Sequence, residues 1–160
     1  MSYTQFQSAT RRPLRRLRAS SVLALFITTA MAATPVAPLN TDGKSLALKG
    51  YDPVAYFTDS KPVKGSAKFS HQWMGATWWF ATPEHRVSFS AAPEKFAPQF
   101  GGYCAWAVSN NHTADVDPEA WKIVDGKLYL NYSKSVQQQW LRDVPGRIQA
   151  AEKNWPALHR

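Results

Sequence analysis

The chain has 160 residues but only one cysteine, Cys104, so no disulfide can form within it. A domain without disulfides must be held together by buried apolar surface, which a chain of this length can supply. Seven tryptophans, six tyrosines and eight phenylalanines are available, so we expect large rings to fill much of the core. In an oxidising compartment a lone thiol is buried and inert, paired with another molecule, or held by a metal.

The first 32 residues have the pattern of a signal peptide. A basic stretch with five arginines precedes the apolar run SSVLALFITTAMAA, and Ala30 and Ala32 give a small-residue cleavage pattern. The run is too short to span a bilayer stably. We therefore predict cleavage after Ala32 and export to a bacterial periplasm. The stretch TRRPLRR partly resembles a twin-arginine signal, but Pro13 and Leu14 fit that signal loosely, so we expect the general secretory pathway.

Removal of this segment changes the charge of the protein. The formal net charge of the whole chain is +8, and without the five arginines 14 basic residues face 11 acidic ones. The remaining lysines are scattered and form no basic stripe of the kind that binds a phosphate backbone. We expect no nucleic-acid partner and no stable membrane span after cleavage.

Residues 33–45 contain prolines and small polar residues without apolar periodicity, which is typical of a flexible lead-in. We start a single domain at Leu46 and extend it to residue 158. Aromatic residues alternate on both sides of Gly75, which predicts a β-hairpin within 69–80. Asp125-Gly126 predicts a second, clearer hairpin within 121–132.

Helix signals follow each hairpin. Thr82 is an N-cap for a helix that Pro93 ends, Ser133 caps a second helix, and Pro145 starts a last one. We find no internal repeat. The patterns together predict a small single α+β domain with two antiparallel hairpins and three to four short helices.

Four segments resemble the exported single-domain type of the YHS family. They are GYDPVAYF at 50–57, YCAWAV at 103–108, WKIVDGKLYLNY at 121–132 and NWPAL at 154–158. The resemblance covers 46–158 and implies a treble-clef-like fold of the YHS and TRASH superfamily, which is associated with heavy-metal handling. Better-known members carry cysteines where this chain has Ala55, Ala81 and His85.

We predict Cys104, His85 and His71 as metal ligands. Thiolate and imidazole are the donors that soft and borderline metals prefer, so we expect copper (Cu) before zinc (Zn). His112 lies in a polar loop and is expected to be a solvated surface side chain. The leading hypothesis is a periplasmic, non-catalytic YHS-type protein that binds a transition metal.

A metal-free module is the main alternative. In it Cys104 is a small buried hydrophobe, and the protein binds a small ligand or a protein partner. Aromatic residues could form the pocket for a flat ligand. The candidates are Tyr51, Tyr56, Trp78, Trp79 and Trp106.

Two further interpretations have less support. If Cys104 were a nucleophile, His85 or His71 would be its base and Asp52 or Asp117 would orient that base, but no local catalytic signature supports an enzyme. The carboxylates of Asp115 and Asp117 could bind a hard cation, although a turn that opens at Asp117-Pro118 accounts for them more simply.

Overall fold

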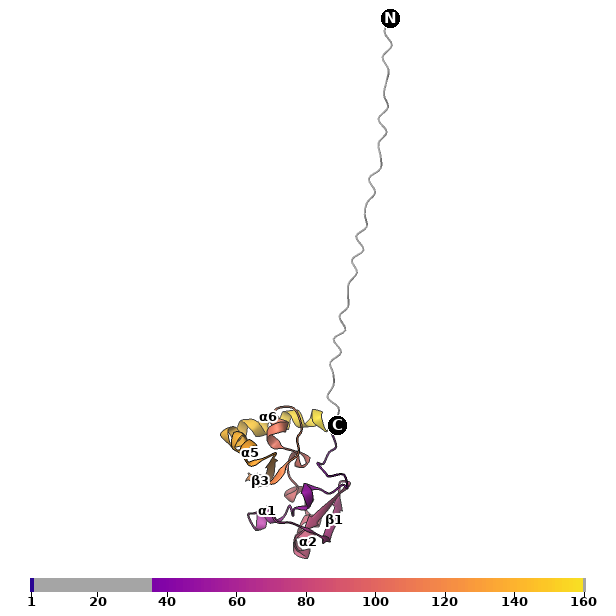
Figure 1. The fold of residues 1–160 in the computed structure, drawn as a ribbon, viewed down its shortest axis with the longest axis vertical. Coiled ribbons are helices and arrows are strands. Elements are labelled where there is room, and N and C mark those ends of the chain that lie inside the picture. The colour runs from indigo at the N-terminus through magenta and orange to yellow at the C-terminus, as the bar shows by residue number, and fades with distance from the viewer. Residues whose placement is uncertain (2–35, 160) are drawn as a thin grey trace. The chain divides into compact units, whose positions relative to one another are not determined.

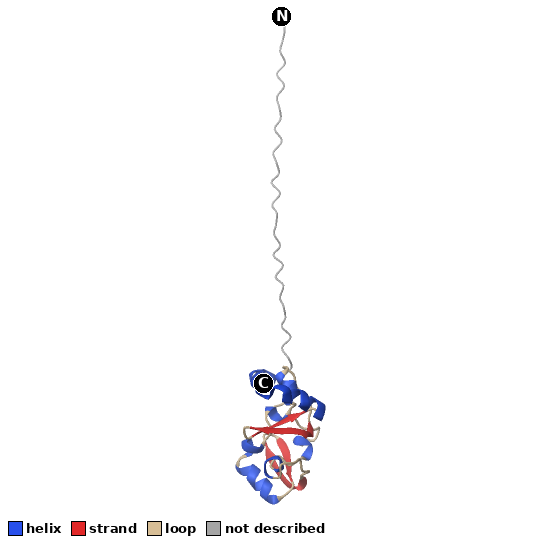
Figure 2. Cartoon of the chain, turned by 90° about the vertical axis from the view of Figure 1, so that its left-hand side faces the viewer, coloured by secondary structure: helices blue, strands red, loops and turns tan. Residues whose placement is uncertain are grey.

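The computed structural model describes Met1 and residues 36–159, so the predicted signal peptide at 1–32 lies outside these described residues, apart from Met1. Two antiparallel hairpins form its sheets, and short helices lie outside them (Figures 1 and 2). The prediction of a small α+β domain with two hairpins is confirmed. In chain order the main elements are α1 (Ala55–Thr58), β1 (Ser66–Trp73), β2 (Ala76–Phe80), α2 (Pro83–Ala91), α3 (Pro93–Phe96), α4 (Ala105–Ser109), β3 (Asp117–Val124), β4 (Lys127–Asn131), α5 (Lys134–Trp140) and α6 (Val144–Leu158).

The helices differ in number and length from those predicted. Six α-helices occur in the described chain, and three of them, α1, α3 and α4, have only four or five residues. Helices this short leave no apolar periodicity to read. None of the helices in residues 36–159 is long and apolar enough to cross a membrane.

Residues 36–45, predicted as a flexible lead-in, are hydrogen-bonded to the domain. The Val36 N–H donates to Leu158 O at 2.8 Å, at the end of α6, and the Asn40 N–H donates to Gly101 O at 2.8 Å. Packing of the described chain therefore begins before Leu46, next to the C-terminal helix (Figure 1).

An internal repeat is present, which corrects the expectation that there is none. A first half, residues 47–91, and a second half, residues 99–140, have the same order of turn, short helix, hairpin and helix. Both hairpins carry a bulge at the same place, and each position of the first hairpin corresponds to the one 51 residues further on. The pairs that flank the bulge are Ser66–Phe80 and Ser70–Trp79 in the first hairpin, and Asp117–Asn131 and Trp121–Leu130 in the second.

The turns and caps repeat as well. Each half opens on three consecutive residues with positive φ, at 48–50 and at 100–102. Thr82 and Ser133 cap the helix after each hairpin, and each side chain accepts a hydrogen bond from the N–H three residues on. The two halves therefore use the same local solutions although few of their residues are identical.

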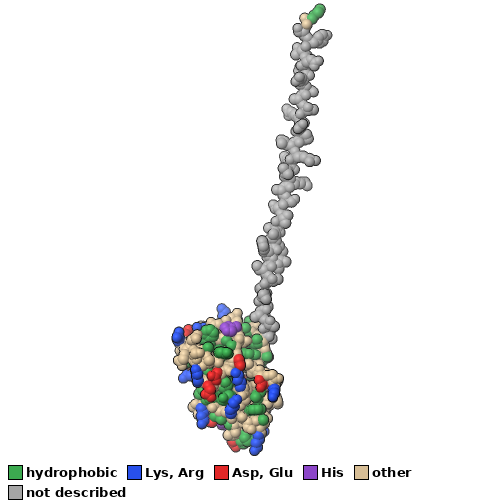
Figure 3. Space-filling view, viewed as in Figure 1, with side chains coloured by type: hydrophobic (Ala, Val, Ile, Leu, Met, Phe, Trp, Pro, Cys, Tyr) green, Lys and Arg blue, Asp and Glu red, His purple; other side chains and the backbone are tan. Residues whose placement is uncertain are grey.

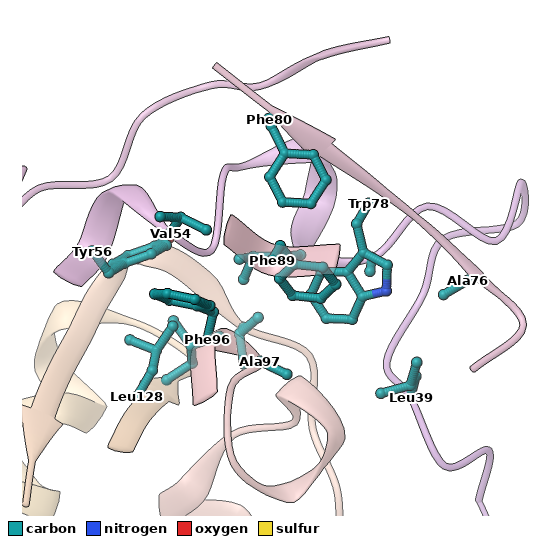
Figure 4. Close-up of a cluster of buried hydrophobic side chains, with 14 of the residues drawn as sticks. Leu39, Val54, Tyr56, Ala76, Trp78, Phe80, Phe89, Phe96, Ala97 and Leu128 are labelled. Atoms are coloured by element: carbon teal, nitrogen blue, oxygen red, sulfur yellow. The ribbon is translucent and has the colours of Figure 1, made fainter. Parts of the chain in front are cut away.

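Equivalent rings pack in the two halves. Phe89 of α2 lies 5.1 Å from Trp78 at an interplanar angle of 33°, and Trp140 of α5 lies 5.5 Å from Tyr129, also at 33°. Figure 4 shows the Phe89 and Trp78 rings side by side in the core of the first half. Large aromatic rings thus fill the core, as the composition predicts.

Tyr56 joins the two halves. Its ring lies edge-on to Trp121 of β3 at 5.2 Å, and its hydroxyl donates to Pro118 O at 3.0 Å. Burial raises the pKa of this phenol, so the hydroxyl stays protonated and able to donate. The outer surface is mixed in charge, with acidic and basic side chains interspersed on the face in Figure 3.

Candidate metal centre

Cys104 is held directly before helix α4 in the second half. Its side chain is fully buried, and its N–H donates to Ala114 O at 3.0 Å. The sulfur accepts a hydrogen bond from the Tyr132 N–H at 3.2 Å and lies 3.9 Å from Asn131 Oδ1. A metal-bound thiolate also accepts N–H donors, so these contacts orient the sulfur in a way that is compatible with ligation.

Cys104, although fully buried, is one of the residues that line a pocket of about 240 Å³. Its wall is mainly apolar, and the two chemically reactive groups on it are the Cys104 thiol and the His112 imidazole. The volume falls just below the range of about 300–1,000 Å³ that is usual for drug-sized ligands. The pocket therefore suits an ion or a small molecule. The other residues of its wall are Trp106, Ala107, Ala114, Tyr132 and Val136.

His112 is exposed, as predicted, but it also lines this pocket. A carbonyl oxygen only accepts, so the 3.2 Å contact from His112 Nδ1 to Asn110 O places the proton on Nδ1. Nε2 then keeps its lone pair. This is the tautomer that metal-bound histidines commonly use. The ring lies edge-on to Trp106, with centroids 6.3 Å apart.

His85 lies in a separate site, in the first half. Its Nδ1 donates to the fully buried carboxylate of Asp52 at 2.7 Å, and its Nε2 lies 3.3 Å from Thr58 Oγ1. Both ring nitrogens therefore already have partners. Asp52 does orient His85, as the enzyme interpretation requires, but the group at the other nitrogen is Thr58 and not the Cys104 sulfur.

His71 also lies away from the pocket wall around Cys104. It stands on β1 opposite Trp78, and its ring lies edge-on to Phe89 with centroids 6.2 Å apart. The structure therefore brings together Cys104 and His112 on one pocket wall, whereas neither His71 nor His85 lines it. Within residues 36–159 no cluster of three or more histidine, cysteine or acidic side chains is placed to hold a metal ion.

Three residues near the sulfur carry no recognisable sequence signal. Asn131 is fully buried, and its Oδ1 accepts the Trp106 N–H at 3.3 Å. Its Nδ2, like Trp106 Nε1, is a buried donor without a hydrogen-bond partner in the described part of the chain. Tyr132 and Val136 complete the wall. The shared Gly-Tyr at 50–51 and 102–103 and the turn glycines Gly75 and Gly126 are slight hints at the repeat that relates these positions to the first half.

The acidic residues of the cation interpretation have other partners. Asp115 Oδ2 forms an ion pair with Lys49 Nζ at 2.7 Å. Burial opposes ionisation of Asp115, but the hydrogen bonds from Lys49, Val116 and Asn40 outweigh it and lower its pKa. Asp117 Oδ1 accepts the Glu119 N–H at 2.9 Å, which is the contact of a turn.

The aromatic residues of the flat-ligand interpretation are spread over the domain. Trp78 lies in the core, Trp79 lines a pocket with Lys44 and Leu46, and Trp106 lines the Cys104 pocket. These rings therefore belong to different environments.

No protein-family model, no curated protein and no solved structure matches this chain. The resemblance to YHS proteins therefore stays a prediction.

Proposed function

We propose that the protein is an exported, non-catalytic binder of a soft metal ion, with monovalent copper as the preferred ion. Cys104 and His112 supply the two donors. The observation that carries this proposal is their place on one pocket wall, with the Nε2 lone pair of His112 left free. His112 thus takes the role that the sequence analysis gave to His85 and His71.

The choice of copper over zinc follows from the donor set. Thiolate suits both Cu(I) and Zn²⁺, but Cu(I) accepts low coordination numbers. Structural zinc sites take four protein ligands and catalytic zinc sites take three. The pocket wall offers two. The predicted export would place a thiol in an oxidising compartment, where burial and ligation both protect it.

An anaerobic titration of Cu(I) against a chromophoric chelator such as bicinchoninate tests the proposal. We expect one equivalent to bind. Cys104→Ser should weaken binding at least ~100-fold, since it removes the soft donor, and His112→Ala about 10-fold or more. His71→Ala is the matched control and should leave the affinity unchanged.

Two results would contradict copper binding at this site. One is the absence of Cu(I) uptake by the wild-type protein, which would favour a metal-free module that binds a small ligand or a protein. The other is uptake that Cys104→Ser leaves intact in a protein with an unchanged unfolding midpoint.

A further inference from the structure

The internal repeat places Cys104 and Asp52 at equivalent positions. The Asp52 N–H donates to Val63 O at 2.8 Å, as the Cys104 N–H does to Ala114 O. An equivalent N–H also meets each side chain: that of Ala81 donates to Asp52 Oδ2 at 2.8 Å, and that of Tyr132 donates to Cys104 Sγ at 3.2 Å. The sulfur therefore occupies the place of a carboxylate.

Asn131 compensates for the replacement of the carboxylate by a sulfur. In the first half the second carboxylate oxygen of Asp52 accepts the Val54 N–H at 2.8 Å. A single sulfur cannot replace two oxygens, and the equivalent N–H, that of Trp106, donates to Asn131 Oδ1 instead. The position of Asn131 is held by Phe80 in the first half. The second half thus keeps its backbone donors satisfied while a thiol stands in the site.

At Val136 the second half loses a donor that no other residue of the described chain replaces. It is equivalent to His85, whose imidazole closes the first site by donating to Asp52 at 2.7 Å. A valine in this place has no donor atom and is shorter than histidine. The Cys104 pocket is therefore open on the side where an imidazole closes the first site, and Val136 forms part of its wall.

We propose that Val136 is the specificity-determining residue of the pocket, because it leaves a third ligand position without a donor. Cu(I) can bind because two protein donors are enough for it. Zn²⁺ and Co²⁺ require at least a third protein donor, which the pocket does not supply. This role rests on the proposed function, since selectivity matters only where a metal binds.

Substitution Val136→His tests the proposal by adding the missing donor. The variant should bind Co²⁺ with the intense near-ultraviolet absorption of a thiolate–cobalt bond, and Zn²⁺ at least ~100-fold more tightly than the wild-type protein. The wild-type protein should show no such absorption. Val136→Leu fills space without a donor and should behave as the wild type. Val136→His combined with Cys104→Ser should lose the absorption.

The outcomes separate this proposal from the proposed function. Thiolate–cobalt absorption in the wild-type protein, or its absence in a folded Val136→His variant, would overturn the role of Val136. If the Val136→His variant binds Co²⁺ but the wild-type protein takes up no Cu(I), the result supports a third ligand position at residue 136 and contradicts the proposed copper binding. An unfolding curve for each variant shows whether the fold is retained.

Discussion

Replacement of Asp52 by alanine is expected to lower the free energy of unfolding by about 3–5 kcal/mol. The carboxylate is fully buried and accepts hydrogen bonds from the Val54 N–H, the Ala81 N–H and His85 Nδ1. Alanine would leave these donors without an acceptor, and each unsatisfied buried group costs about 1–3 kcal/mol. The loss is a large share of the roughly 5–15 kcal/mol that stabilises a domain.

Chemical denaturation measures this effect through the midpoint and slope of unfolding. Asp59→Ala is the matched control, because Asp59 is exposed and directly follows helix α1, which Asp52 precedes. Its effect on the free energy of unfolding should stay within about 0.5 kcal/mol. A loss below about 1 kcal/mol for Asp52→Ala would show that the buried network does not hold the first half together.

The second large effect is expected from the equivalent rings of the two cores. Phe89 is fully buried against Trp73, Trp78 and Phe80, and Trp140 is fully buried against Tyr129. Truncation of such a ring removes its contacts and leaves a cavity. Phe89→Ala and Trp140→Ala should each lower the free energy of unfolding by about 3–5 kcal/mol. Figure 4 shows the Phe89 ring among its neighbours.

Val87→Ala provides the control on the same helix as Phe89, since the Val87 side chain is exposed. Its effect should lie within about 0.5 kcal/mol. Denaturation followed by tryptophan fluorescence and by circular dichroism gives both the size of each loss and a test of cooperativity. A Trp140→Ala effect far smaller than that of Phe89→Ala would contradict the structural equivalence of the two halves.

The hairpins and helix starts could be predicted because their signals are local. Asp125-Gly126 adopts the two positive φ values of a tight hairpin turn, and Thr82 and Ser133 accept the N–H groups that an N-cap must satisfy. Each signal lies within a few residues of the structure that it specifies. The α+β class follows from the order of these elements.

The repeat could not be predicted, because it is carried by hydrogen bonds and register. Asp52 and Cys104 occupy the same place with unrelated side chains, as do His85 and Val136. The side-chain exchange leaves the backbone pattern unchanged, since an N–H needs only some acceptor. The Gly-Tyr pairs at 50–51 and 102–103 and the turn glycines Gly75 and Gly126 are among the few identities that persist in the sequence.

The histidine that shares a pocket with Cys104 could not be predicted for a related reason. His85 and His71 stand on regular elements whose faces can be read from periodicity, whereas His112 follows helix α4 in a loop. Where a loop lies depends on long-range packing. Here the loop that carries His112 lies beside the Cys104 pocket, whose wall includes Trp106 and Val136. A polar loop histidine therefore gave no sign that it shares a pocket with a buried thiol.

X-ray absorption at the copper edge, on protein loaded anaerobically with one equivalent of Cu(I), tests the Cys104–His112 site most directly. We expect one sulfur and an imidazole nitrogen around the metal, and loss of that nitrogen in His112→Ala. A first shell without sulfur, or with two sulfurs from two chains, would contradict the site.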